Sequence, residues 1–121
     1  MPISLKRAYE APAKEDGLRL LVERLWPRGL TKHKAAIAEW FRDVAPSQDL
    51  RKWYGHDPER WPEFRRRYLD ELRRNKDEIE RLRSRIRQEK RPVTFVYAAK
   101  DELRNSAVVL KEYLERPHRK T

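Results

Sequence analysis

The chain has 121 residues, which is enough for one domain with a single hydrophobic core and too few for two. It contains no cysteine, and this excludes disulfide bonds, thiolate catalysis and zinc bound through cysteine. Thirty Lys and Arg against twenty Asp and Glu give a net charge of +10. Such a charge favours a polyanionic partner such as nucleic acid, unless it only reflects the solvated faces of long helices.

The first half of the chain predicts two strands and two helices. Residues 3–9 alternate apolar and polar side chains, as in a half-buried strand near a sheet edge. After a loop, residues 18–25 form an apolar run that a Trp-Pro-Arg-Gly turn stops, which is typical of a buried strand in a parallel sheet. Apolar residues at helical spacing favour a helix over 31–44, with a short strand at 38–44 as the alternative. Ser47 suits the N-cap of a short helix that ends near Tyr54.

The second half predicts helices around one more apolar strand. Residues 59–89 are helical, either as two helices that meet at Asn75 or as one kinked helix. Pro92 ends this region, and a second apolar strand over 92–99 begins there. Residues 105–114 predict a final helix, and 116–121 a flexible basic tail. Strands that alternate with helices predict an α/β fold, a small layered domain with a mostly parallel sheet of about four strands covered by helices.

No apolar run reaches the ~18 residues that a membrane-spanning helix needs. The first residues alternate like a strand, and no apolar leader with a small-residue cleavage site precedes it. We therefore expect a cytoplasmic protein that does not enter the membrane. The oligomeric state is not predicted by any pattern in the sequence.

Polar side chains follow the two apolar strands. If these strands are adjacent and parallel, the polar side chains gather on the edge where open α/β sheets bind ligands. The candidate ligand-binding residues on this edge are Arg24, Trp26, Arg28, Gly29, Arg104 and Asn105. Arg28 is the best of them, because a guanidinium suits phosphate or carboxylate and Gly29 lets the backbone approach an anion closely. Asn105 or Asp101 can cap the final helix, whose first amides would then face a phosphate.

Turnover at this edge would require an acid, a base or a nucleophile. Glu23 and Asp101 are the carboxylates placed for acid–base chemistry, and Lys100 is the candidate base or amine nucleophile. Each feature also has a structural interpretation. Glu23 and Arg24 would then form internal ion pairs, Asp101 a surface pair or helix cap, and Trp26 the rim of the core.

A third group of residues interleaves aromatic and basic side chains, as a surface that stacks nucleic-acid bases would. Its members are Trp53, Tyr54, His56, Asp57, Arg60 and Trp61. Trp53 and Trp61 are better explained as core anchors of the long helical region. His33, His56 and His118 lack the spacing of metal ligands, so we expect no metal, and no cofactor motif is present.

Several segments resemble the YeaO-like branch of a bacterial family of domains of unknown function. The resemblance is carried by residues 5–9, 21–29, 45–47, 50–53 and 97–101, together with Asn105 and Ala107. It implies a small α/β domain with a mostly parallel sheet and a strand at 38–44, and it brings no established activity. Glu23 stands where the family usually has Asp, and Arg104 where many relatives have other polar residues, including His. Wider relatives use a cysteine after the last strand, and its absence here counts against thiol chemistry.

Three hypotheses for the function follow. The leading one is a protein that binds a phosphate-bearing ligand, a nucleotide or nucleic acid, at the edge formed by Arg24, Arg28, Lys100 and Asn105. The second is a non-enzymatic nucleic-acid-binding protein that uses the Arg-rich helical face between Arg60 and Arg87. The third is a protein-interaction module whose charge serves solubility only.

Overall fold

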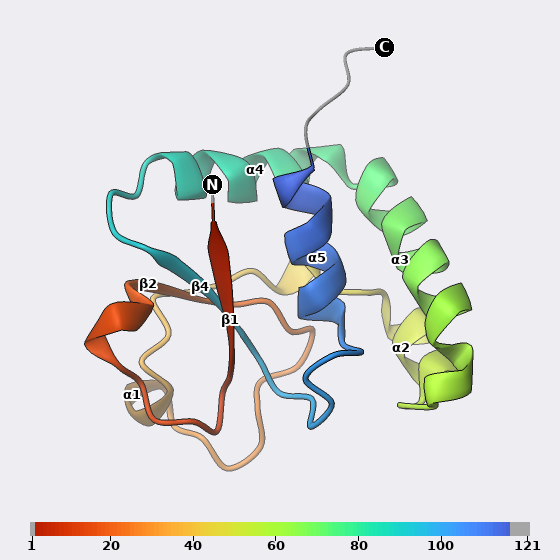
Figure 1. Ribbon diagram of the computed structural model, residues 1–121, viewed down its shortest axis with the longest axis horizontal. Coiled ribbons are helices and arrows are strands. Elements are labelled where there is room, and N and C mark those ends of the chain that lie inside the picture. Colours follow the sequence, from red (N-terminus) through yellow and green to blue (C-terminus); the bar gives the residue numbers. More distant parts are fainter. Residues whose placement is uncertain (1, 117–121) are drawn as a thin grey trace.

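The computed structural model describes residues 2–116 and contains one parallel sheet of four strands in the order β1-β4-β2-β3 (Figure 1). The strands are β1 (Ile3–Arg7), β2 (Leu18–Leu21), β3 (Glu39–Trp40) and β4 (Val93–Tyr97). Strand β4 pairs with β1 on one side and with β2 on the other. The predicted α/β class is confirmed, and so is the side-by-side, parallel arrangement of the two apolar strands.

Within residues 2–116, five α-helices pack on the two faces of the sheet. They are α1 (Lys32–Ala35), α2 (Gln48–Tyr54), α3 (Trp61–Arg74), α4 (Lys76–Arg87) and α5 (Ser106–Glu115). Short 3-10 turns occur at Lys14–Asp16, Arg42–Val44 and Pro58–Arg60. No helix within residues 2–116 has both the length and the apolar character that crossing a bilayer requires. Apart from Arg116, the predicted basic tail over 116–121 lies outside the described residues.

The predicted caps and the predicted break between helices are present. The Ser47 hydroxyl accepts a hydrogen bond from the Leu50 N–H at 3.2 Å and so caps α2. Helices α3 and α4 meet at Asn75, so the interpretation as two helices is right. The Asn75 side-chain amide donates to the Asp43 carbonyl at 2.7 Å, which ties this corner to the segment that follows β3.

The predicted helix over 31–44 is wrong in most of its length. Helix α1 stops at Ala35, and Ala36 takes a left-handed conformation with φ 51°. The chain then runs beside β2, where the Ala38 N–H donates to the Arg19 carbonyl at 2.9 Å, and it forms β3. The strand alternative over 38–44 is therefore right in kind but much too long. Pairing with a buried neighbouring strand outweighed the helical spacing of a few apolar residues.

The other strands are also shorter than predicted. The strand expected over 3–9 ends at Arg7, the one over 18–25 ends at Leu21, and the one over 92–99 covers Val93–Tyr97. In each case the apolar pattern continues beyond the last paired residue, because side chains in the exit loops are still partly buried. Apolar periodicity reports burial, and it does not mark where the hydrogen-bonded ladder stops.

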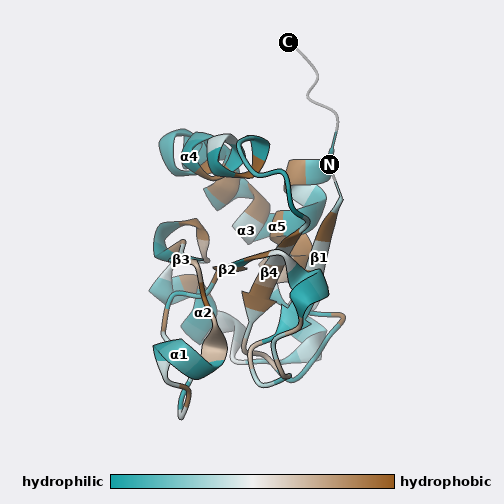
Figure 2. Cartoon of the chain, turned by 90° about the vertical axis from the view of Figure 1, so that its left-hand side faces the viewer, coloured by the Kyte–Doolittle hydropathy of each residue, from teal (hydrophilic) through white to brown (hydrophobic). Residues whose placement is uncertain are grey.

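The two faces of the sheet are covered unequally. Helices α2 to α5 pack on the face that presents Leu18, Leu20 and Phe95, and they form the main core with it. Among the described residues, the opposite face, with Leu21 and Val96, is covered by α1 and the loops beside it. Figure 2 shows apolar residues along the strands and on the helix sides turned toward them, whereas α1 is largely hydrophilic.

A buried ion pair between Asp16 and Arg19 lies at the amino end of β2 and also holds Lys6 of β1. Asp16 is only 8% exposed and accepts hydrogen bonds from Lys6 Nζ, from the Ala13 N–H and, at 2.6 Å, from Arg19. Burial alone would raise the pKa of Asp16, but the hydrogen bonds from Ala13, Lys6 and Arg19 outweigh it and lower the pKa. Nothing in the sequence pattern singled out this pair.

Candidate functional site at the carboxyl edge of the sheet

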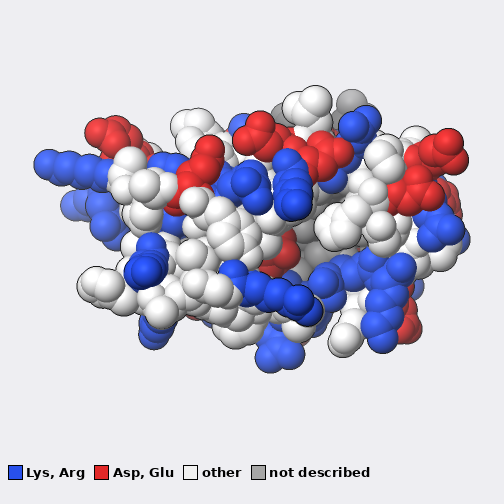
Figure 3. All heavy atoms as spheres, turned by 90° about the horizontal axis from the view of Figure 1, so that it is seen from below, with Lys and Arg blue, Asp and Glu red and all other residues white. Residues whose placement is uncertain are grey.

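The chain leaves β2 and β4 toward opposite faces of the sheet. After β2 it turns to the face covered by α1, and after β4 it leads to α5 on the other face. Two adjacent parallel strands whose exits part in this way leave a crevice between their carboxyl ends, and open α/β sheets bind their ligands in such crevices. Figure 3 looks onto this edge from below and shows a hollow near its centre, with an acidic side chain on its wall and Lys and Arg around it.

Glu23 lies at this crevice, two residues after the end of β2. Its carboxylate accepts a hydrogen bond from the N–H of Ala98, which directly follows β4. The Trp40 indole N–H donates to the Glu23 carbonyl at 2.6 Å and holds the backbone in place. Burial raises the pKa of Glu23 to about 7, although the Ala98 N–H and the charge of Arg51 act to lower it. A carboxyl group that titrates near neutrality can accept or donate a hydrogen bond.

Arg51 brings a positive charge to this carboxylate from a different part of the fold. It lies in α2, on the main-core side of the sheet, and is partly buried. Its charge acts on Glu23, yet within residues 2–116 its side chain forms no ion pair and no hydrogen bond. A partly buried guanidinium near an acceptor, with its own donors unused, is suited to bind an anionic group.

The donors of Arg24, a predicted ligand residue, are used in contacts within the protein. Its guanidinium donates to the carbonyls of Ala45, at 2.8 Å, and Pro46, at 3.2 Å, and it pairs with Asp43. These contacts fasten the exit of β2 to the start of α2. The interpretation of Arg24 as a structural residue with partners elsewhere in the fold therefore describes it, with two backbone carbonyls as acceptors beside the Asp43 carboxylate.

Trp26, Arg28 and Gly29 belong to a turn on the thinly covered face. The Trp26 indole N–H donates to the Leu30 carbonyl at 2.6 Å, and its ring packs edge-on against Trp40 at 5.6 Å. Trp26 thus lines the rim of the second core cluster. Gly29 has φ 78° and open space where a Cβ would stand, and the Arg28 side chain is exposed. The structure does not bring this turn into contact with Asn105, which begins α5 on the opposite face.

Asp101, Arg104 and Asn105 are gathered after β4 and satisfy one another. The Asp101 carboxylate accepts from the Leu103 and Arg104 N–H groups and pairs with the Arg104 guanidinium at 2.8 Å. These contacts lower the pKa of Asp101, and the hydrogen bond from the Arg104 side chain has the largest effect. Asn105 caps α5 through the Val108 N–H at 3.0 Å, and its amide donates to the Asp101 carbonyl. Lys100, in contrast, is exposed.

The third predicted cluster divides between core and surface. Tyr54, Trp61 and Phe64 stack in the main core, with Tyr54 and Phe64 centroids 4.4 Å apart, so the anchor interpretation of Trp61 is right. Trp53 also packs against this core, and Arg60 and Arg67 lie over its ring at 5.4 Å and 4.4 Å.

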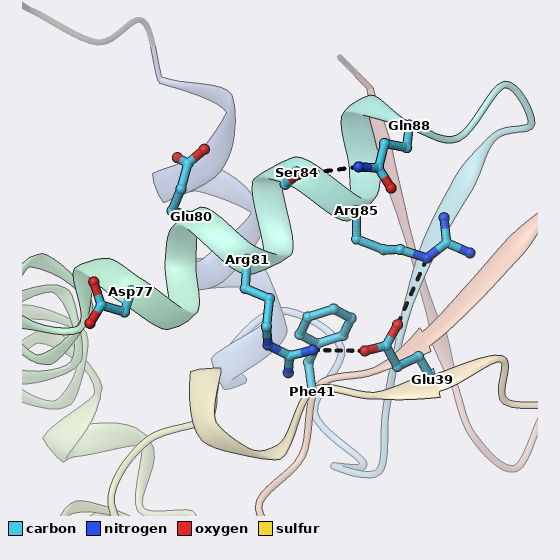
Figure 4. Close-up of a pocket in the computed structure, with 8 residues that line it drawn as sticks. All are labelled: Glu39, Phe41, Asp77, Glu80, Arg81, Ser84, Arg85 and Gln88. Atoms are coloured by element: carbon cyan, nitrogen blue, oxygen red, sulfur yellow. Dashed lines mark hydrogen bonds and ion pairs between the residues drawn. The ribbon is translucent and has the colours of Figure 1, made fainter.

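Two hollows have linings that include neither Glu23 nor Arg51. One, of about 410 Å³, lies between β3 and α4, and there Arg81 and Arg85 both reach Glu39 while Arg81 covers the Phe41 ring (Figure 4). The other, of about 340 Å³, is lined by Arg24, Tyr68 and Glu71 among others. Many of the charged groups in these hollows already have partners, since Glu39 pairs with Arg81, Arg24 with Asp43, and Glu71 accepts from Ser47.

The sequence pattern missed Arg51, which comes from a helix far along the chain from Glu23. Its only signal was its place in residues 50–53, a segment that carries the family resemblance. Within residues 2–116, no group of three His, Asp or Glu side chains is arranged to hold a metal ion.

Comparison with known proteins places this chain in a family. The sequence profile described as the inactive DUF488-N3 subclade matches residues 2–121. The chain belongs to the DUF488-N3 family. Uncharacterized protein YeaO of Escherichia coli is 40% identical to it over 114 residues, which cover 94% of this chain and 97% of YeaO. Uncharacterized protein Rv3073c of Mycobacterium tuberculosis is 40% identical over 114 residues, or 93% of this chain and 92% of that protein. The YeaO-like resemblance is thereby confirmed, and no solved structure matches this DUF488-N3 member.

Proposed function

We propose that this protein binds a small phosphate-bearing molecule of the nucleotide class in the crevice between the ends of β2 and β4. The observation that carries the proposal is that the buried Glu23 carboxyl at this crevice lies within the electrostatic reach of Arg51. The two side chains act on each other electrostatically without a direct ion pair between them. The Glu23 carboxylate offers an acceptor, and the Arg51 guanidinium offers a set of unused donors.

The chemistry of the two groups suits the two parts of a nucleotide. The Arg51 guanidinium provides the paired donors that a phosphate accepts. The Glu23 carboxyl, whose pKa is raised to about 7 by burial, accepts from or donates to a hydroxyl or a base N–H. Lys100 and Arg28 follow the two strands that border the crevice, and both are exposed, so they can add positive charge near a bound phosphate.

Several observations support binding without turnover. Asp101, the second candidate acid or base, is held by the Arg104 side chain and by backbone N–H groups, so it is used as a cap. Asp101 is therefore already engaged and is not offered to Glu23 as the second carboxylate of an acid–base pair. The matching family profile is itself described as inactive.

The Arg-rich helical face is a weaker candidate for a phosphate-binding surface. Arg66 and Arg67 pair with Glu63, Arg73 pairs with Asp70, and Arg81 pairs with Glu78 and Glu39. Paired guanidinium groups attract a polyanion less than free ones, because a carboxylate already occupies their donors. This face is well explained as the solvated side of two helices.

The test is calorimetric titration of the protein with nucleoside monophosphates, using Arg51→Ala and the control Lys52→Ala. Lys52 is the next residue of α2, carries the same charge and is exposed. Loss of charge-assisted hydrogen bonds is expected to weaken binding about tenfold or more in Arg51→Ala. The control is expected to bind like the wild type. Equal affinities for Arg51→Ala and Lys52→Ala would contradict the proposed site, and release of product from a bound nucleotide would contradict the absence of turnover.

A further inference from the structure

A continuous stretch of the chain carries positive charge and no acidic residue. Residues 24–38 contain Arg24, Arg28, Lys32 and Lys34 and not one Asp or Glu. Arg24 is bound to backbone carbonyls, whereas the other three side chains are exposed. These three residues lie on the turn after β2 and on α1, which cover the thin face of the sheet.

This stretch differs from the rest of the surface. On α3, by comparison, arginines lie beside carboxylates three or four residues away, as Arg66 does with Glu63 and Arg73 with Asp70. Arg28, Lys32 and Lys34 form no ion pair among residues 2–116. Unpaired cations keep their full attraction for an anionic partner.

An exposed aromatic ring borders these cations. Tyr9 is 46% exposed, and its hydroxyl donates to the Arg28 carbonyl at 2.9 Å. The Arg7 guanidinium lies 5.5 Å from the centre of the Tyr9 ring and is itself held by the Ala99 carbonyl at 2.9 Å. The hydroxyl is thus tethered and Arg7 lies over one face of the ring, while 46% of the residue stays exposed and can contact a partner.

We propose that Tyr9, Arg28, Lys32 and Lys34 form a binding surface for single-stranded nucleic acid. Proteins that bind single strands combine cations that follow the phosphates with aromatic rings on which bases stack, and this surface has both elements. Lys32 follows Arg28 by four residues, so their Cα atoms are at most about 14 Å apart. The cations and the ring can therefore contact neighbouring nucleotides of one strand. The surface shares only Arg28 with the proposed nucleotide site and does not include Glu23 or Arg51, so the lysine and Tyr9 variants below test it separately from the crevice.

The same observations distinguish this partner from two others. A duplex is read by a helix or ribbon inserted in the major groove, and α1, with four residues, is too short for that role. Attachment to an anionic membrane needs an apolar face on an amphipathic helix, whereas α1 is exposed at Lys32, His33 and Lys34 and buries only Ala35 against its own sheet. Stacking on Tyr9 requires a base that is free of its pairing partner, as in a single strand.

The experiment is fluorescence anisotropy with a labelled oligothymidine of about 12 nucleotides, a length within the range that single-strand binding sites cover. The double variant Lys32→Ala/Lys34→Ala is compared with Lys76→Ala/Lys90→Ala, which removes two exposed lysines elsewhere. We expect the first to bind at least about tenfold more weakly at 0.1 M salt and to lower the slope of log K against log salt by about 1.4. The second is expected to bind within about twofold of the wild type.

A second pair of variants tests the stacking platform separately from charge. Tyr9→Ala is expected to weaken binding about tenfold, and Tyr9→Phe, which keeps the ring, to retain most of it. Circular dichroism confirms that each variant is folded. Equal losses in the two lysine variants would overturn the proposal, because they would indicate attraction by net charge alone. The proposal would also be overturned by wild-type affinity in Tyr9→Ala. Tighter binding to a duplex of the same length, or to vesicles with anionic lipid, would overturn it as well.

Discussion

Gly17 occupies a position that no other residue can take without a clash. Its φ is 64°, and a Cβ built there would stand 2.1 Å from the Pro92 carbonyl oxygen. The close approach exists because the Leu18 N–H donates to the same oxygen at 2.8 Å and begins the pairing of β2 with β4. We expect Gly17→Ala to lower the free energy of unfolding by about 3 kcal/mol or more, since backbone on both sides has to move. Urea denaturation measures the loss.

Gly29 provides the matched control for this prediction. Its φ of 78° is similarly unfavourable for an L-residue, but nothing lies within 4 Å of the position that a Cβ would take. Gly29→Ala is therefore expected to cost only the conformational strain, about 1 kcal/mol. If the two substitutions cost the same, the close contact at Gly17 contributes nothing, and the tight pairing of β2 with β4 would be in doubt.

At the scale of elements, the cap of α5 is stronger than the cap of α1. Asn105 is 4% exposed, accepts from the Val108 N–H and donates to the Asp101 carbonyl, and α5 packs in the main core. Asn105→Ala leaves both partners unsatisfied, and we expect a loss of about 2 kcal/mol in the free energy of unfolding. Thermal unfolding followed by circular dichroism measures it.

Thr31 is the comparison for this cap. Its hydroxyl accepts from the Lys34 N–H at 3.1 Å, but the residue is exposed and α1 has only four residues. Thr31→Ala is expected to cost no more than about 0.5 kcal/mol, because water satisfies the freed N–H. A larger cost for Thr31→Ala than for Asn105→Ala would show that burial does not set the value of these caps.

The elements that the sequence predicted best are those with long patterns or a specific cap. Helix α2 follows from Ser47, and the break at Asn75 follows from the interrupted apolar stripe. The segment 31–44 failed, because a helix of four residues and a strand of two are both shorter than any periodicity can resolve. What decides β3 is its pairing with β2, a contact between segments about twenty residues apart.

At the scale of the whole molecule, the sequence predicted that the two apolar strands are adjacent. Of the two charged residues at the crevice, it predicted one and missed the other. Glu23 follows directly from its position after an apolar strand. Arg51 does not, because α2 reaches the crevice only through the packing of the main core and the contacts of Arg24 with Ala45 and Pro46. Placing residues on opposite faces also needed the topology, which separates the Arg28 turn from Asn105.

The stability of the whole molecule should fall as the pH rises toward neutrality. Burial raises the pKa of Glu23 from 4.5 to about 7, so between these values the folded protein holds a proton that the unfolded chain has lost. The free energy of unfolding then decreases with pH over this window, by at most about 3 kcal/mol. At lower pH, Asp16 has the opposite effect on the free energy of unfolding. Because its pKa is lowered in the folded protein, stability is lost as the pH falls below 3.8.

Glu23→Gln tests this profile, because an amide resembles the protonated carboxyl group and can still accept from the Ala98 N–H. We expect urea denaturation to give this variant the same stability at pH 4.5 and pH 7, whereas the wild type loses stability between them. Glu102→Gln, which changes an exposed carboxylate near the same edge, should keep the slope of the wild type. Parallel curves for the wild type and Glu23→Gln would mean that the carboxylate is solvated when charged. In that case the Glu23 carboxylate would be charged at pH 7 in the folded protein, stabilised by water or by Arg51, and the pKa of about 7 would be wrong.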